Sequence, residues 1–126
     1  MTVLDFSKMK AEGHKISMST CYDFWSAQLV ADSHIDALLV GDSVAMVVYG
    51  YPTTVSATVE MMSSHTAAVR RGAGDKFTVT DMPFLTARSG LETAMRSVGD
   101  LMKAGASAVK IEGIDGQEEI VRHIVE

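Results

Sequence analysis

The chain has 126 residues, 47% of them hydrophobic, with a formal net charge of −5, which suits one small globular domain over residues 1–126. The acidic balance argues against a nucleic acid or an anionic membrane surface as partner, because no basic cluster is longer than Arg70-Arg71. A single cysteine, no apolar signal segment and no run near the roughly 20 apolar residues of a membrane helix predict a cytoplasmic protein.

The first elements in chain order are a helical arm, a strand and a helix. Residues 1–13 are polar with few bulky apolar positions, and they predict a short helical arm packed on the body. Residues 16–20 alternate apolar with small polar side chains, which indicates a half-buried strand. Asp23 is placed to cap the amino end of a helix over residues 24–32.

The next strand is a short apolar run at residues 37–40, typical of a strand buried on both faces. It ends in Gly41-Asp42-Ser43, residue types that belong in a turn. Residues 44–55 are apolar but interrupted by glycine and proline, and they predict a long loop over the edge of the sheet. A helix over residues 58–71, capped by Thr58, should follow.

The second half of the chain repeats the alternation. Residues 77–80 predict a third strand, and residues 89–92 match a capping box that opens a helix ending near a Lys-Ala-Gly sequence. Residues 107–111 predict a fourth strand. A second capping box at residues 115–118 opens a last helix.

Strands and helices therefore alternate four times, an order that predicts a parallel sheet with its strands in sequence order. Four such units are half of a (β/α)8 barrel, which needs about 250 residues. The predicted class is thus α/β, of the TIM-barrel family, with one half-barrel in this chain. A half-barrel leaves the inner face of its sheet without cover, so we expect self-association or docking on a second half-barrel through this face.

Three of the predicted strands run directly into an acidic residue. Asp42, Asp81 and Glu112 follow the second, third and fourth strand. Parallel strands bring their carboxyl ends to one edge of the sheet, where α/β proteins bind ligands. Oxygen ligands from separate strand ends suit Mg²⁺, which keeps several waters and leaves room for a substrate. The alternative is that each acid caps the turn that follows it, as is common in βα loops.

Other residues carry two interpretations each. Lys110 interrupts an apolar strand two positions before Glu112 and on the same face, so it is either the ion-pair partner of that acid or an anchor for an anionic ligand. Ser43 could donate to a ligand oxygen or serve as a turn hydroxyl. His65 lies on the apolar stripe of its helix, as core histidines do. Cys21 has no evident base, and we expect a small buried hydrophobe.

Four blocks in fixed order carry a resemblance to a known family: Val40-Gly41-Asp42-Ser43, residues 65–72, Asp81-Met82-Pro83-Phe84 and Val109-Lys110-Ile111-Glu112-Gly113. Over nearly all of its length the sequence closely resembles the ketopantoate hydroxymethyltransferases, also called 3-methyl-2-oxobutanoate hydroxymethyltransferases. The resemblance implies a (β/α)8 barrel that catalyses the first committed step of pantothenate biosynthesis, with Mg²⁺ as metal and 5,10-methylenetetrahydrofolate as co-substrate.

The resemblance also implies roles for single residues. Asp42 and Asp81 would bind the metal, with Glu112 near it and acting through water. Ser43 and Lys110, together with Asp81, would contact the keto acid. Metal chelated by the keto acid would withdraw charge, acidify the C3–H bond and stabilise an enolate that attacks the folate-borne carbon.

Two features keep a second hypothesis open. In the family the general base is a glutamate of the second half of the barrel, outside the residues of this chain, and Pro52 stands in a loop position that usually holds an acid. One hypothesis is the amino-terminal half of a working transferase, completed by the second half-barrel or within a homo-oligomer. The other is a non-catalytic half-barrel or small α/β module that binds Mg²⁺ or a keto acid and acts as an assembly partner.

Overall fold

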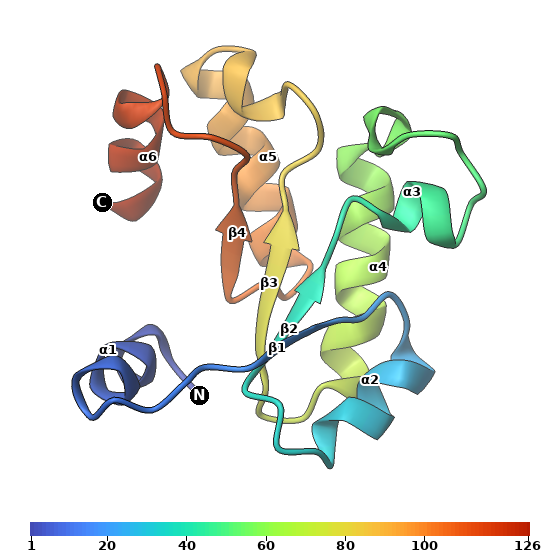
Figure 1. Ribbon diagram of the computed structural model, residues 1–126. Helices are drawn as coiled ribbons and strands as arrows, with labels where there is room; N and C mark the ends of the chain where they lie inside the picture. The colour runs from blue at the N-terminus through green and yellow to red at the C-terminus, as the bar shows by residue number, and fades with distance from the viewer.

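Four strands pair side by side in one parallel sheet, in the order β1-β2-β3-β4 (Figure 1). The computed structural model describes residues 1–126. The register aligns Leu39 with Val79 and Val79 with Ala108. The predicted parallel sheet in sequence order is therefore confirmed. The strands are β1 (Met18–Thr20), β2 (Ala37–Val40), β3 (Phe77–Asp81) and β4 (Ala108–Lys110).

Helices follow each strand along the chain, which gives the four βα units expected from the alternating pattern (Figure 1). None of the helices is both long enough and apolar enough to cross a membrane. The helices are α1 (Val3–Ala11), α2 (Phe24–Ala31), α3 (Val44–Val47), α4 (Val59–Gly72), α5 (Leu91–Lys103) and α6 (Glu118–Val125), with 3-10 turns η1 (Thr54–Ser56) and η2 (Thr86–Arg88).

The two faces of the sheet have different partners. Leu38 and Val40 of β2 are fully buried with Met62 of α4 in the main core, on the side of the helices. On the opposite face, Phe77 packs edge-on against Phe6 of α1, with ring centroids 4.8 Å apart. The amino-terminal arm therefore covers the amino ends of the strands on the face that a closed barrel turns inward.

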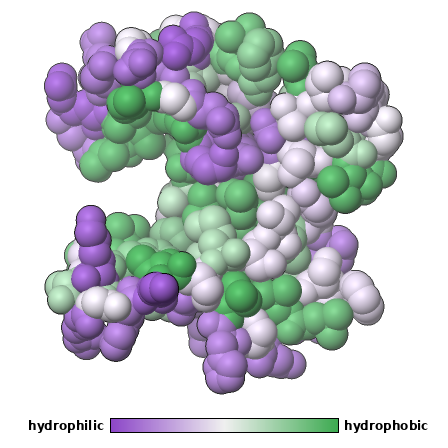
Figure 2. Space-filling model, in the orientation of Figure 1, coloured by the Kyte–Doolittle hydropathy of each residue, from purple (hydrophilic) through white to green (hydrophobic).

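Parts of the sheet stay open. Ile16, which precedes β1, is 43% exposed, and Met18, the first residue of β1, is 50% exposed. At the other edge, β4 and α6 enclose an apolar hollow of about 240 Å³, and Figure 2 shows hydrophobic residues along a notch between α6 and α1. Self-association, or docking of a second half-barrel, on this side of the molecule stays a prediction. Either would bury the apolar side chains of these open regions.

The segment after β2 differs from the prediction of a long loop over residues 44–55. The structure instead has the short helix α3 directly after Ser43, and the 3-10 turn η1 further on. Val44 and Ala45 are fully buried and anchor α3 in the core. A helix of four residues is too short to display a helical period, so the apolar run alone could not indicate it.

The two predicted capping boxes are wrong. Gly90 is the N-cap of α5, and the hydroxyl of Ser89 donates instead to the carbonyl O of Leu85 (2.8 Å). At α6 the N-cap is Gln117, whose side-chain amide donates back to the carbonyl O of Gly113 (2.9 Å). Both matches fail because the residue with a capping oxygen lies one or two positions before the true N-cap.

Two other predicted caps are confirmed. Asp23 accepts a hydrogen bond from the backbone N of Ser26 (2.8 Å) at the start of α2. Thr58 accepts one from the backbone N of Met61 (3.1 Å) at the start of α4. Each satisfies a backbone donor that the first turn of a helix leaves without an internal partner.

Gly72 marks the closest approach between α2 and α4. A Cβ added there would lie 2.4 Å from the carbonyl O of Phe24 and 3.0 Å from Cβ of Ala27. Backbone atoms cannot move aside cheaply, so we expect Gly72→Ala to lower the free energy of unfolding by about 1–3 kcal/mol in urea titrations.

Gly99 in α5 provides a matched control for that substitution, because a Cβ added there meets nothing within 4 Å. Gly99→Ala should raise the free energy of unfolding by about 0.5–1 kcal/mol through helix propensity alone. Equal stability of the two variants would show that α2 moves aside without cost.

Candidate functional site at the carboxyl edge of the sheet

The strands deliver three of the predicted site residues to one place. Asp81 ends β3 and Lys110 ends β4, and the register makes these two residues direct partners. Lys110 Nζ lies 3.0 Å from Asp81 Oδ1. The backbone N of Asp42, just beyond β2, donates to Asp81 Oδ2 (3.1 Å). Asp42, Asp81 and Lys110 therefore meet at the carboxyl edge. The strand-then-acid pattern predicts Asp42 and Asp81 there together with Glu112, which reaches this group through its ion pair with Lys110.

Asp81 carries the feature most suited to a cation. Asp81 is 5% exposed, and its Oδ1 forms an ion pair with Lys110 Nζ at 3.0 Å. The ammonium group of Lys110 is shared with Glu112, so it only partly offsets the negative charge of the acids at this edge. The remaining negative charge fits a hard divalent cation such as Mg²⁺, which prefers carboxylate ligands.

The surroundings of Asp42 disfavour the ionised form of its carboxyl group. Burial, followed by the negative charge of Asp81, raises the pKa of Asp42 above its ordinary value, and Lys110 only partly offsets this. Two acids held close together without a hydrogen bond between their carboxyl groups cost stability when both are ionised. Such an arrangement is expected where a ligand cation supplies the missing charge.

Asp42→Asn is therefore expected to raise the free energy of unfolding at pH 7, by about 0.5–2 kcal/mol. Because the pKa of Asp42 is higher in the folded state, that state keeps a proton that the unfolded state has already lost. Wild-type stability should thus fall as pH rises from the ordinary pKa through the raised one, and the variant should lack this loss.

Urea unfolding over a pH series measures both effects. Asp75→Asn serves as the control, because Asp75 is an exposed acid outside the site. An Asp42→Asn protein less stable than wild type at pH 7 would contradict the claim that the acid pair is strained.

Glu112 lies differently from the other two acids. Its carboxylate accepts a hydrogen bond from Lys110 Nζ (2.5 Å), which lowers the pKa of Glu112, while its side chain is 76% exposed. Burial disfavours the charge on Lys110, but its bonds to Glu112 and Asp81 outweigh this and raise the pKa of Lys110. No group of three His, Cys, Asp or Glu side chains is close enough to hold a metal ion. A metal role for Glu112 through water stays a prediction.

Ser43 has a partner that the sequence did not indicate. Its hydroxyl lies 2.7 Å from the hydroxyl of Tyr22, and it makes no capping bond to α3. The ring N–H at Nδ1 of His65 donates to the carbonyl O of Tyr22 (2.5 Å), and Nε2 lies 3.1 Å from the hydroxyl of Tyr49. His65 is thus a satisfied structural histidine, as expected, and it holds the segment that positions Tyr22.

Gly41 allows these groups to approach one another. A Cβ at this position would lie 2.9 Å from Ser43 Oγ and 3.6 Å from Asp81 Oδ2. A side chain here would therefore displace the Ser43 hydroxyl. The glycine of the Gly41-Asp42-Ser43 turn is required for close packing of the site rather than for an unusual backbone angle.

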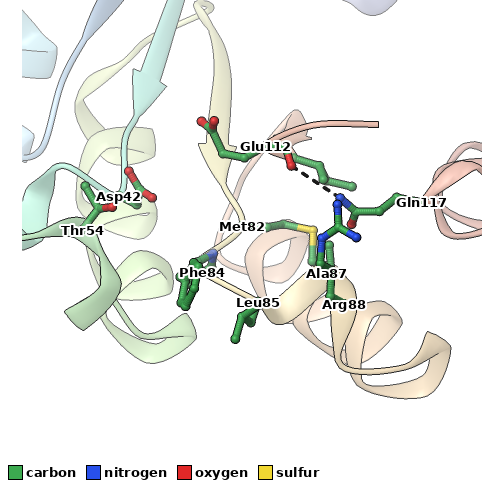
Figure 3. A pocket seen from close by; sticks show the side chains of 11 residues that line it. Asp42, Thr54, Met82, Phe84, Leu85, Ala87, Arg88, Glu112 and Gln117 are labelled. Carbon is green, nitrogen blue, oxygen red and sulfur yellow. Dashed lines mark hydrogen bonds between the residues drawn. The ribbon is translucent and has the colours of Figure 1, made fainter. Parts of the chain in front are cut away.

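A cavity of about 480 Å³ opens beside the acids (Figure 3). Asp42 and Thr54 lie on one side of it and Arg88 and Gln117 on the other, with Met82 between them. The segments that line it follow β2, β3 and β4, which places the cavity at the carboxyl edge of the sheet. A cleft at this edge is the usual ligand site of parallel α/β proteins.

Successive parallel βα units in sequence order, with a cleft at the carboxyl edge of the sheet, are the arrangement of (β/α)8 barrels, of which this chain has four units. The sequence model of one family, described as "Ketopantoate hydroxymethyltransferase", matches residues 1–126. The chain belongs to this family, which confirms the resemblance of its motifs.

Curated relatives agree with that assignment. A 3-methyl-2-oxobutanoate hydroxymethyltransferase of Bdellovibrio bacteriovorus is 54% identical over 125 residues, covering 99% of this chain and 48% of the relative. Proteins of the same name from Coxiella burnetii and Legionella pneumophila are 51% and 53% identical, again over 99% of this chain and 47% and 48% of the relative. The chain thus spans about half the length of the curated relatives it matches.

Solved structures share the fold at low sequence identity. A 2,3-dimethylmalate lyase of the PEP mutase/isocitrate lyase superfamily matches with a TM-score of 0.70 at 20% identity, over 99% of this chain and 47% of that one. A phosphoenolpyruvate phosphomutase from Streptomyces platensis subsp. rosaceus matches with a TM-score of 0.70 at 15% identity, over 88% and 38%. These similarities confirm the half-barrel architecture.

Proposed function

We propose that the protein containing this chain transfers a hydroxymethyl group from 5,10-methylenetetrahydrofolate to 3-methyl-2-oxobutanoate, giving ketopantoate for pantothenate biosynthesis. Membership of the family supports the reaction. The observation that carries the site assignment is the pair of neighbouring acids Asp42 and Asp81 at the carboxyl edge, whose negative charge Lys110 only partly offsets. The chain would supply the metal and keto-acid contacts of the site.

Asp42 and Asp81 would hold Mg²⁺ in this proposal, since the negative charge of Asp81 acts on Asp42 and Asp42 lines the cavity. When bound, the metal supplies electron withdrawal from the keto acid and stabilises the negative charge that develops as the C3 proton leaves. A bound cation would relieve the repulsion between the two acids that contributes to the raised pKa of Asp42.

Lys110 would bind the carboxylate of the keto acid. Its present partner Glu112 is 76% exposed, and a surface ion pair of this kind contributes only about 0–1 kcal/mol. A ligand carboxylate can therefore replace Glu112 at little cost, while Asp81 keeps the ammonium group in position. The hydroxyl of Ser43, fixed by Tyr22, would donate to another oxygen of the keto acid.

The test is made on the full-length protein with Mg²⁺, the keto acid and 5,10-methylenetetrahydrofolate, with ketopantoate measured by mass spectrometry. A second readout omits the folate and follows exchange of the C3 hydrogen of the keto acid in D₂O by proton NMR. Product formation and Mg²⁺-dependent exchange are expected. A protein that shows neither would overturn the proposal and favour the non-catalytic alternative.

A further inference from the structure

The cavity extends well beyond the acids that would hold the metal. Its volume of about 480 Å³ lies in the range of about 300–1,000 Å³ that suits a drug-sized ligand, whereas a branched five-carbon keto acid is much smaller. In Figure 3, Asp42 lies at one end and Arg88 at the other, with Phe84 and Leu85 along the side between them. The far end therefore has room for a second, larger ligand.

Arg88 gives the far end a positive charge. It is the only cationic side chain that lines the cavity, and no carboxylate forms an ion pair with it. One of its N–H groups donates to the carbonyl O of Asp115 (3.1 Å), which leaves further donors of the guanidinium available. A guanidinium held in this way is suited to recognise the carboxylate of a ligand.

The loop that carries Arg88 has a strained backbone. Leu85, with φ of +63°, is the only residue other than glycine at positive φ, an arrangement that costs about 1–3 kcal/mol. The turn is held by paired hydrogen bonds: the carbonyl O of Pro83 accepts from the backbone N (3.0 Å) and the hydroxyl (2.6 Å) of Thr86.

This strained turn presents apolar side chains to the cavity instead of the core. Phe84 and Leu85 line the cavity and are 56% and 54% exposed. Burial of these two side chains in the core therefore does not offset the conformational strain of the turn. Strain that persists at the wall of a cleft is typical of a site that binds a ligand.

We propose that residues 83–88 form the subsite for the one-carbon donor, which is separate from the keto-acid contacts. Phe84 and Leu85 would receive a flat aromatic ring system, and Arg88 would pair with an anionic group on its tail. This inference rests on the proposed function, because the second ligand is taken to be the donor of that reaction. It assigns the donor to the same cleft as Asp42, so the transferred carbon can reach the keto acid.

Binding of tetrahydrofolate to the full-length protein, in the presence of Mg²⁺ and the keto acid, tests this subsite by calorimetry. Arg88→Gln is expected to raise the Kd for tetrahydrofolate about tenfold, through loss of a charged hydrogen bond, and to leave the Kd for the keto acid unchanged. Arg96→Gln is the matched control, because Arg96 pairs with Glu92 on α5 (2.9 Å), outside the cavity, and should change neither value.

A tail-free analogue, 6-methyltetrahydropterin, separates ligand recognition from loop collapse. It should bind wild type and Arg88→Gln equally, whereas equal weakening of both ligands would overturn the role of Arg88. Leu85→Gly should weaken both ligands with little change in thermal stability, because relief of strain offsets the lost side chain.

Two results separate this inference from the proposed function. A wild-type protein that binds tetrahydrofolate through Arg88 but forms no ketopantoate would reject the proposed reaction and support the subsite. Unchanged tetrahydrofolate affinity in Arg88→Gln, in a wild type that does form ketopantoate, would overturn the subsite alone.

Discussion

Magnesium added together with 3-methyl-2-oxobutanoate is expected to bind at least about a hundredfold more weakly when Asp42 and Asp81 are both replaced by asparagine. Loss even of a residue that only supports a metal ligand typically costs about 10–100-fold in affinity, and here both carboxylate ligands are removed. The negative charges of the two acids, which Lys110 only partly offsets, would favour a cation at this position. Calorimetry on the full-length protein measures the affinity directly.

The same double variant should lose about 10²–10³-fold in kcat, because a metal supplies several kcal/mol of charge stabilisation in the transition state. Glu60→Gln, an exposed acid in the first turn of α4, is the control and should leave both measurements unchanged. Equal Mg²⁺ affinity of the double variant and wild type would reject the assignment of both acids.

A protein made of residues 1–126 alone is expected to turn over about 10²–10⁴-fold more slowly than the full-length Bdellovibrio bacteriovorus relative. The resemblance assigns the general base to the second half of the barrel, and loss of a positioned base typically costs this factor. Side-by-side assays of mass-verified samples, with Mg²⁺ and both substrates, measure the ratio.

Binding provides the control for that comparison. The short protein should still bind Mg²⁺ with the keto acid, because Asp42, Asp81 and Lys110 are all present and placed by their own strands. Activity equal to that of the full-length relative would show that the base lies within these residues.

The architecture could be predicted because each unit repeats one local pattern. An apolar run followed by an acid and then a helical stretch recurs at β2, β3 and β4, and only a parallel sheet joins such units with short connections. The same pattern predicts Asp42, Asp81 and Glu112 at one edge, and the period of two along β4 adds Lys110 on the same face as Glu112. The prediction depends on the repetition of this pattern, because each strand has at most five residues and is too short to be identified with certainty by itself.

Features that depend on contacts between distant segments could not be predicted. The hydroxyls of Tyr22 and Ser43 are 21 residues apart in sequence, and their bond exists only because β1 and β2 are neighbours. The one signal for Tyr22 was its place just after a strand, the same criterion that selected the acids. The strained turn at Leu85 could not be predicted either, because the residue at positive φ is not a glycine or an asparagine, the types that commonly adopt this conformation.

Lys110 limits the kind of inhibitor that this edge of the sheet can accept. Covalent reagents aimed at lysine are attacked by its neutral amine, whereas the bonds to Glu112 and Asp81 raise the pKa of Lys110 and favour its protonated form. Cys21, the only thiol, is 2% exposed at the end of β1 and is shielded from electrophiles. Compounds directed here would have to bind reversibly, as anions that take the ammonium group of Lys110 away from Glu112.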